Sequence, residues 1–95
     1  MELNQILKSN PHTIIDVRTE EEYNDGHIAD AINIPIEKIA ENFERIKQMP
    51  QPVILCCESG SLSRKAHIHL SQQGFMNTYN GGSWLELNAL KNNNQ

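Results

Sequence analysis

The sequence predicts one α/β domain in which a mainly parallel sheet is flanked by helices. Two observations favour this class. Short runs rich in apolar and β-branched residues, as at 12–17 and 52–57, alternate with segments whose apolar residues recur every three or four positions. Such alternation is typical of right-handed βαβ units, whose strands are parallel. The chain has 95 residues, which is enough for one compact domain and too few for two.

The N-terminal part is expected to form a helix, a strand and a second helix. The apolar residues of "ELNQILKSN", residues 2–10, have helical spacing, and Pro11 would end that helix. "HTIIDV", residues 12–17, is short and β-branched, as a buried strand is. Thr19 precedes Glu22 by three positions, which is the spacing of a capping box at the start of a short helix.

The middle of the chain is expected to contain two strands with a helix between them. "AINIPI", residues 31–36, is a short extended run ended by proline. "PVILCC", residues 52–57, is apolar throughout, as parallel strands covered on both faces tend to be. Between them, four apolar residues mark one face of a single amphipathic helix that begins near residue 36: Ile39, Ala40, Phe43 and Ile46.

The C-terminal part is expected to contain a long helix, a strand and a final helix. Residues at helical spacing predict the long helix, with Gly74 as its left-handed cap and Phe75 covering its last turn. "MNTYN", residues 76–80, predicts a last strand, after which "GGS" turns the chain and Ser83 caps the final helix. The residues that mark the long helix are Leu62, Ala66, Leu70 and Gln73.

Composition and charge exclude several classes of protein. Residues 1–90 are expected to form the domain and 91–95, "KNNNQ", a flexible polar tail. The net charge of −4 argues against nucleic acid as the main partner. No apolar run approaches the ~20 residues that cross a bilayer, and the N-terminus lacks the features of a secretory signal. We therefore expect a cytoplasmic protein with no membrane partner.

The two cysteines, Cys56 and Cys57, end the most strand-like segment. Neighbouring cysteines would close a strained ring and link no distant segments, so free thiols are expected. Side chains alternate along a strand, so Cys57 should adjoin the following loop while Cys56 packs in the core on the opposite face. Loop N–H groups and the start of the next helix would favour the Cys57 thiolate, which is the nucleophilic form. The small side chains of Ser59 and Ser61 would leave a concave mouth through which the sulfur is accessible.

Four segments resemble the motifs of single-domain rhodaneses, the sulfurtransferase family. They are "IIDVRTEEEYNDGHIADAINIP", "VILCCESGSLS", "HLSQQGF" and "YNGGSWLEL", which follow in the family's order between about residues 12 and 87. The resemblance implies a small three-layer α/β domain and a persulfide-forming Cys57. It also implies that the substrate is bound by the loop residues Glu58, Ser59, Gly60, Ser61, Leu62 and Ser63.

The resemblance further implies how the chain acts. A sulfane sulfur would pass from thiosulfate or a persulfide, through a Cys57 persulfide, to cyanide, a small thiol or a protein thiol. Neither a metal nor an organic cofactor is needed, and the protein is expected to be a monomer. Asp16 and Arg18 would hold the architecture beside the site, and Gly26 and His27 would form a structural turn.

Two departures from the family pattern bear on the substrate. Many relatives have Arg at the sixth loop position, where this chain has Leu62, and Glu58 adds negative charge. Arg is the residue best suited to bind a dianion such as thiosulfate. Arg64 and Lys65 compensate only in part, because Arg64 should rotate partly away from the loop. We therefore expect weak use of thiosulfate and a persulfide as the natural donor.

Three other functions compete with sulfur transfer. Phosphatases of the same fold need Arg six positions after the nucleophile, where this chain has Ser63. A non-catalytic binding or regulatory module usually lacks the cysteine, which is present here. A metal site built from the two cysteines, His67 and His69 lacks zinc spacing, and the two histidines are better explained as a solvated helix face.

Overall fold

The computed structural model describes residues 3–8 and 11–93. Four strands form a parallel sheet in the order β2-β1-β3-β4. This confirms the parallel sheet that the sequence predicts. The strands are β1 (Thr13–Asp16), β2 (Ile32–Asn33), β3 (Val53–Cys57) and β4 (Thr78–Ser83).

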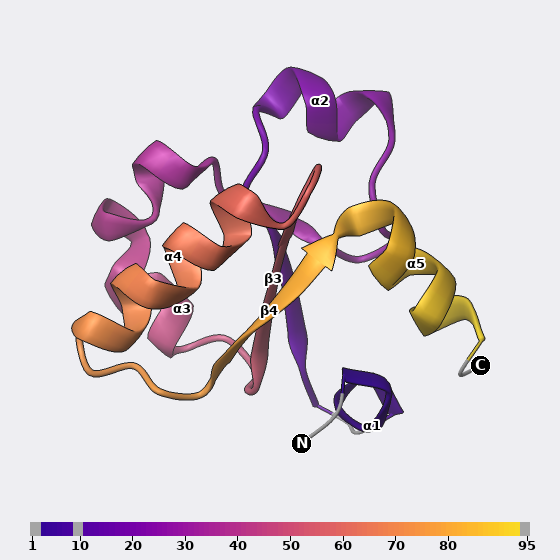
Figure 1. The fold of residues 1–95 in the computed structure, drawn as a ribbon. Coiled ribbons are helices and arrows are strands. Elements are labelled where there is room, and N and C mark those ends of the chain that lie inside the picture. Colours follow the sequence, from indigo (N-terminus) through magenta and orange to yellow (C-terminus); the bar gives the residue numbers. More distant parts are fainter. Residues whose placement is uncertain (1–2, 9–10, 94–95) are drawn as a thin grey trace.

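Helices cover both faces of the sheet, so the domain has three layers (Figure 1). α3 and α4 lie on one face and α1 and α5 on the other, while α2 stands beyond the carboxyl ends of the strands. The helices are α1 (Leu3–Lys8), α2 (Glu20–Asp25), α3 (Phe43–Lys47), α4 (Ser61–Gln72) and α5 (Trp84–Asn92). Two 3₁₀ turns, η1 (Ile36–Lys38) and η2 (Ala40–Asn42), precede α3.

Strand β3 divides the apolar core into two clusters. Val53, Leu55 and Cys57 face α3 and α4. Ile54 and Cys56 face α1 and α5. All five side chains are buried, which explains why the segment is apolar throughout instead of alternating. The two cysteines therefore lie in different clusters, as strand alternation predicts.

The local signals for helix ends are confirmed. Thr19 Oγ1 accepts from the N–H of Glu22, and the Glu22 carboxylate accepts from the N–H of Thr19, which completes the capping box of α2. Gly74 has φ 93°, and the N–H of Phe75 donates to the Leu70 carbonyl at 3.0 Å. Ser83 Oγ accepts from the N–H of Glu86 at 3.4 Å and caps α5.

The prediction of a single amphipathic helix after residue 36 is wrong. Two 3₁₀ turns come first, and α3 has only five residues. Ile36 and Ile39 are three positions apart, a spacing that a 3₁₀ helix satisfies as well as an α-helix does. Ala40, expected on the buried face, is exposed.

The "GGS" segment belongs to β4 instead of forming a turn after it. Leu55 pairs with Asn80 and Cys56 with Gly82, so one extra residue, Gly81, is inserted in β4 as a bulge. A Cβ atom at Gly81 would lie 2.8 Å from Ile54 Cγ2, so this position has no room for a side chain. At the bulge, the backbone of β4 lies so close to the core that only glycine fits.

The start of the expected tail is also different. Lys91 and Asn92 belong to α5, and the Lys91 ammonium donates to the Ala29 carbonyl at 2.7 Å. Residues 94–95 of the expected tail lie outside the described residues. The last helix is therefore held to the loop before β2 by its C-terminal turn.

Candidate active site

The loop that follows β3 connects Cys57 to the start of α4 at the carboxyl end of the sheet (Figure 1). Gly60 adopts the left-handed conformation, with φ 95°, and precedes the first residue of α4. A Cβ atom at Gly60 would lie 3.1 Å from Gly82 Cα, so the loop packs closely against the end of β4. Glycine is needed at this position for both conformation and space.

The loop places backbone N–H groups around the sulfur of Cys57. The N–H of Gly60 donates to Cys57 Sγ at 3.0 Å and the N–H of Ser63 at 3.4 Å. The thiol in turn donates to Ser63 Oγ at 3.4 Å. Cys57 is only 1% exposed, so these groups hold its sulfur below the surface. The sequence predicts such a cradle of main-chain donors, although with a more open sulfur.

The hydrogen bonds decide the ionisation of Cys57. Burial by itself raises the pKa of this thiol, but the Ser63 hydroxyl, once it turns to donate to the thiolate, and the N–H groups of Ser63, Gly60 and Ser59 oppose it. Together they lower the pKa of Cys57 below its ordinary value. The thiolate is thus stabilised although almost no water reaches it.

Cys56 has the opposite environment. Its side chain is 0% exposed and packs with the apolar residues that face α1 and α5. Burial, reinforced by the negative charge of Asp16, raises the pKa of Cys56 to about 12. The Cys56 thiol is therefore an inert core group at neutral pH.

The first turn of α4 places Leu62 outward and Ser63 inward. Leu62, expected in the substrate-binding loop, is 39% exposed, whereas Ser63 is fully buried. The buried Ser63 completes the surroundings of the Cys57 sulfur, so α4 turns Leu62 outward. A hollow of about 360 Å³ adjoins the loop and is lined by Ser59, Gly60, Ser61, Arg64, Lys65 and Ile68.

A buried ion pair supports the other side of the loop. Arg18 and Asp16 form a two-pronged contact, with the Arg18 Nη2 atom 2.7 Å from Asp16 Oδ2. The Arg18 guanidinium stacks over the Trp84 ring at 4.6 Å, and its Nη1 atom lies 3.8 Å from Glu58 Oε2. Arg18 also donates to the Gly26 carbonyl at 2.7 Å. The structural role expected for Asp16, Arg18 and Gly26 agrees with these contacts.

Asn80 is a loop-supporting residue that the sequence reasoning did not single out. It lies on β4, and its side chain contacts Ser63, Gly60 and Gly82. The only sequence signal is its position in "YNGGSW", directly before the two glycines. That position says nothing of a contact with a residue 17 positions earlier.

The sequence predicts that the two histidines on α4 lie on a solvated helix face, but His67 contacts the sheet. His67 Nδ1 lies 2.7 Å from Thr78 Oγ1, and both residues are at least partly buried. This contact ties α4 to β4. Across residues 3–8 and 11–93, no three His, Cys, Asp or Glu side chains are grouped as metal ligands are. Nor does this part of the chain contain a helix with the length and apolar character needed to span a bilayer.

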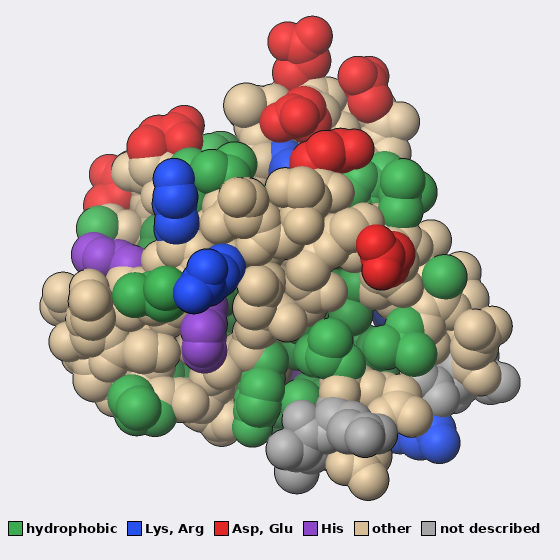
Figure 2. Space-filling view, viewed as in Figure 1, with side chains coloured by type: hydrophobic (Ala, Val, Ile, Leu, Met, Phe, Trp, Pro, Cys, Tyr) green, Lys and Arg blue, Asp and Glu red, His purple; other side chains and the backbone are tan. Residues whose placement is uncertain are grey.

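Charge is unevenly distributed around the loop. Figure 2 shows acidic side chains gathered over α2 and basic ones over α4. The acidic residues of α2 include Glu20, Glu21 and Glu22, and those of the basic side include Arg64 and Lys65. Glu58, with a side chain 66% exposed, adds negative charge at the loop itself. An incoming anion therefore meets favourable charge only from the α4 side.

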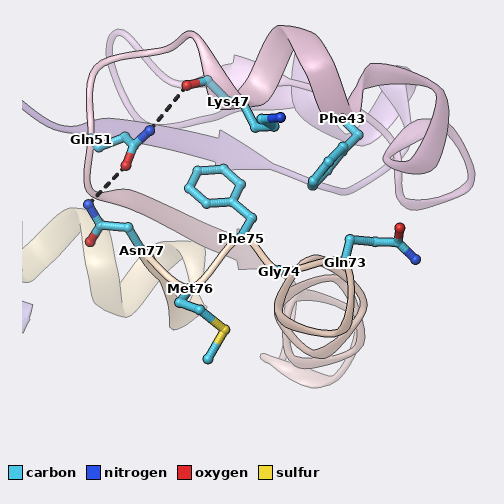
Figure 3. A pocket seen from close by; sticks show the side chains of 8 residues that line it. All are labelled: Phe43, Lys47, Gln51, Gln73, Gly74, Phe75, Met76 and Asn77. Carbon is cyan, nitrogen blue, oxygen red and sulfur yellow. Dashed lines mark hydrogen bonds between the residues drawn. The ribbon is translucent and has the colours of Figure 1, made fainter.

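A second hollow of about 380 Å³ lies away from the loop, where the chain enters β4 (Figure 3). Phe43 and Phe75 form its apolar wall, and Gln51 links the Lys47 carbonyl to the Asn77 side chain across one rim. It contains none of the predicted site residues. The loop after β3 is thus where the predicted site residues meet.

Comparison with known proteins identifies the family. A family model described as rhodanese-like domain matches residues 1–86. The chain belongs to this family. The family motifs in the sequence span about residues 12–87. The match to the family model is longer because it includes the N-terminal helix.

Relatives and solved structures agree with this assignment. The thiosulfate sulfurtransferase GlpE of Shewanella oneidensis is 34% identical over 92 residues, covering 93% of this chain and 90% of the relative. GlpE of Coxiella burnetii is 32% identical over 75 residues, covering 79% and 69%. A rhodanese from E. coli, solved with anions, has a TM-score of 0.73 at 30% identity and covers 80% of this chain and 91% of that chain.

Proposed function

We propose that the protein is a sulfurtransferase in which Cys57 carries the sulfur. The observation that carries this proposal is the position of Cys57 Sγ among main-chain donors that lower its pKa. A stabilised thiolate is the nucleophile that sulfur transfer requires. Relatives over nearly the whole chain are named thiosulfate sulfurtransferases, which supports the same activity here.

The reaction consists of two displacements at sulfur. In the first, the Cys57 thiolate attacks the outer sulfur of the donor; the donor's S–S bond breaks, and its electron pair leaves with sulfite or a thiolate. In the second, an acceptor thiolate or cyanide attacks the outer sulfur of the Cys57 persulfide, and Cys57 leaves as a thiolate. The N–H groups of Gly60 and Ser63 stabilise the Cys57 thiolate that attacks in the first step and leaves in the second.

We further propose that the natural sulfur donor is a persulfide and that thiosulfate is used only weakly. Leu62 offers no charge, and Glu58 puts a carboxylate at the mouth of the loop. The guanidinium of Arg18 is 4% exposed and already engaged by Asp16 and Glu58, so it is not free for a dianion. Only the α4 side, with Arg64 and Lys65, is favourable to an anion.

The remaining assignments belong to the same proposal. Glu58, Ser59, Gly60, Ser61, Leu62 and Ser63 form the substrate-binding loop. The acceptor is a small thiol or a protein thiol, and the enzyme acts as a monomer in the cytoplasm. A domain of this size that needs no cofactor for the two displacements is sufficient for the complete transfer.

Intact mass spectrometry tests the proposal directly. The protein is incubated with thiosulfate and, separately, with glutathione persulfide, and the excess donor is removed. We expect an adduct of about 32 Da, one sulfur atom, formed faster from the persulfide. The adduct should disappear when glutathione is added. Absence of the adduct with both donors would overturn the proposal and favour a non-catalytic rhodanese-like module.

A further inference from the structure

Ser63 has one hydroxyl proton and three neighbours that bear on it. Its Oγ atom lies 2.6 Å from Asn80 Oδ1, 3.2 Å from the Gly60 carbonyl oxygen and 3.4 Å from Cys57 Sγ. A hydroxyl can donate only once at a time. Which neighbour receives that proton determines whether Ser63 assists or opposes a negative charge on the sulfur of Cys57.

The orientation of the Asn80 amide is fixed by two backbone groups. The N–H of Gly82 faces one amide atom at 3.0 Å, and because an N–H can only donate, that atom is the oxygen Oδ1. The carbonyl of Gly60 faces the other at 3.3 Å, and because a carbonyl can only accept, that atom is the nitrogen Nδ2. The atom that faces Ser63 is therefore an acceptor.

The short contact between Ser63 and Asn80 consequently uses the Ser63 proton. Asn80 Oδ1 has no proton to give, so at 2.6 Å the hydroxyl must be the donor. The Gly60 carbonyl competes weakly, because it is farther away and already accepts from the N–H of Arg64 at 3.1 Å. In this arrangement Ser63 presents lone pairs to Cys57 and can only accept the proton of its neutral thiol.

We propose that Asn80 is a positioning residue of the active site, whose side-chain oxygen holds the single proton of Ser63 and so controls whether that hydroxyl can donate to the Cys57 sulfur. When Cys57 loses its proton to water, Ser63 must turn away from Asn80 to donate to the thiolate. Asn80 thus resists ionisation of Cys57, while the N–H groups of Gly60 and Ser63 promote it. The inference rests on the proposed function only in taking Cys57 as the nucleophile.

The main test measures the pH midpoint of Cys57 alkylation by iodoacetamide, with the labelled peptide identified by mass spectrometry. In Asn80→Ala, the freed Ser63 proton favours the thiolate, so the midpoint should fall. A neutral hydrogen bond is worth a factor of about five in an equilibrium, and the thiolate-to-thiol ratio at a given pH should rise by about that factor. In Asn80→Asp, a carboxylate holds the proton more firmly, and the midpoint should rise.

The opposite directions separate this role from a merely structural one. Both variants lose the donor to Gly60, so a loosened loop would move both midpoints the same way. In a Ser63→Ala background, Asn80→Ala should have no further effect on the midpoint, because no proton remains to be released. Asn77→Ala, a change before β4 that contacts Gln51 instead of the loop, is the matched control and should leave the midpoint unchanged.

Several results would overturn the proposal. These are midpoints that move together in the two Asn80 variants, no shift in Asn80→Ala, or an equal shift with and without Ser63. The assay contains no sulfur donor, so it gives an answer even if sulfur transfer is absent. Sulfur transfer with unmoved midpoints would leave the proposed function intact and remove the role of Asn80 alone.

Discussion

Cys56 and Cys57 are neighbours in the chain and equally buried, yet their thiols ionise in opposite directions. Cys56 is 0% and Cys57 1% exposed. The pKa of Cys56 is raised to about 12, mainly by burial, whereas the pKa of Cys57 is lowered. Burial opposes the charged form at both positions. Two further influences differ: only Cys57 meets the N–H and hydroxyl donors of the loop, and the negative charge of Asp16 raises the pKa of Cys56.

The comparison teaches that burial alone does not make a cysteine inert. A sulfur enclosed by apolar side chains stays protonated, but a sulfur enclosed by correctly aimed donors ionises more readily. One step along a strand is enough to exchange one environment for the other, because adjacent side chains point to opposite faces of the sheet. Four experiments can contradict this account or refine it.

The largest effect is expected from exchanging the two thiols for hydroxyls in turn. Cys57→Ser should abolish formation of the sulfur adduct, since a serine hydroxyl is not ionised at neutral pH. Cys56→Ser should retain most of it, because this side chain lies in the opposite core cluster. Intact mass after incubation with a persulfide measures both. Equal loss in the two variants, with both folded by circular dichroism, would contradict the distinction.

The next effect concerns the ion pair beside Cys56. Asp16 pairs with Cys56 in the sheet register and neutralises the buried Arg18. Asp16→Ala leaves that guanidinium uncompensated, and the free energy of unfolding should fall by about 3–5 kcal/mol in urea titrations. Lys47→Ala, which breaks the exposed pair with Glu44, should cost less than about 1 kcal/mol. Similar losses in both variants would show that the pair with Asp16 is not buried in solution.

The opposite pKa shifts predict opposite effects of pH on stability. The raised pKa of Cys56 contributes stability that is present below the ordinary value of 9.0 and is lost as pH rises toward about 12. The lowered pKa of Cys57 contributes stability that is present above its unfolded value and is lost as pH falls through its folded value.

Above pH 9, the stability of the native protein should therefore fall by up to about 1.4 kcal/mol per pH unit through Cys56 alone. The measurement is urea unfolding across this range, compared with Cys56→Ala, in which the slope should be smaller. Comparing slopes instead of absolute stabilities removes the cost of the cavity in the variant. An unchanged slope would mean that Cys56 is not kept protonated by the fold.

The smallest expected effect concerns charge at the mouth of the loop. Leu62→Arg places a guanidinium where an anionic donor arrives, and thiosulfate turnover should rise about three- to tenfold. Leu85→Arg introduces the same charge at an exposed position on α5 and should have little effect. A steady-state assay with cyanide as acceptor measures both. An equal rise in turnover in both variants would indicate that the net charge of the protein, and not the position of the new arginine, determines the effect.

Local features of this fold could be read from the sequence. The capping box of Thr19 and Glu22, the left-handed Gly74 and the alternation of Cys56 and Cys57 each depend on residues within a few positions of one another. Their geometry follows from backbone rules that hold in any context. The position of the loop at the carboxyl end of the sheet follows from the parallel topology.

Contacts between distant segments could not be read in this way. Asn80 reaches Ser63, and His67 reaches Thr78, only because β4 lies beside β3 and α4 packs over both. The prediction of a single helix after residue 36 was wrong for another reason. Its apolar spacing is compatible with both a 3₁₀ helix and an α-helix.

Gly60 in the loop packs closely on Gly82 in β4, 22 positions later in the chain. A change in one of these two segments therefore affects the other. Neither glycine carries a functional group, and both have positive φ. An alanine at 60 would place its Cβ atom 3.1 Å from Gly82 Cα, so β4 would have to give way by a few tenths of an ångström. A side chain can therefore be accommodated at this position of the loop only if the last strand moves with it.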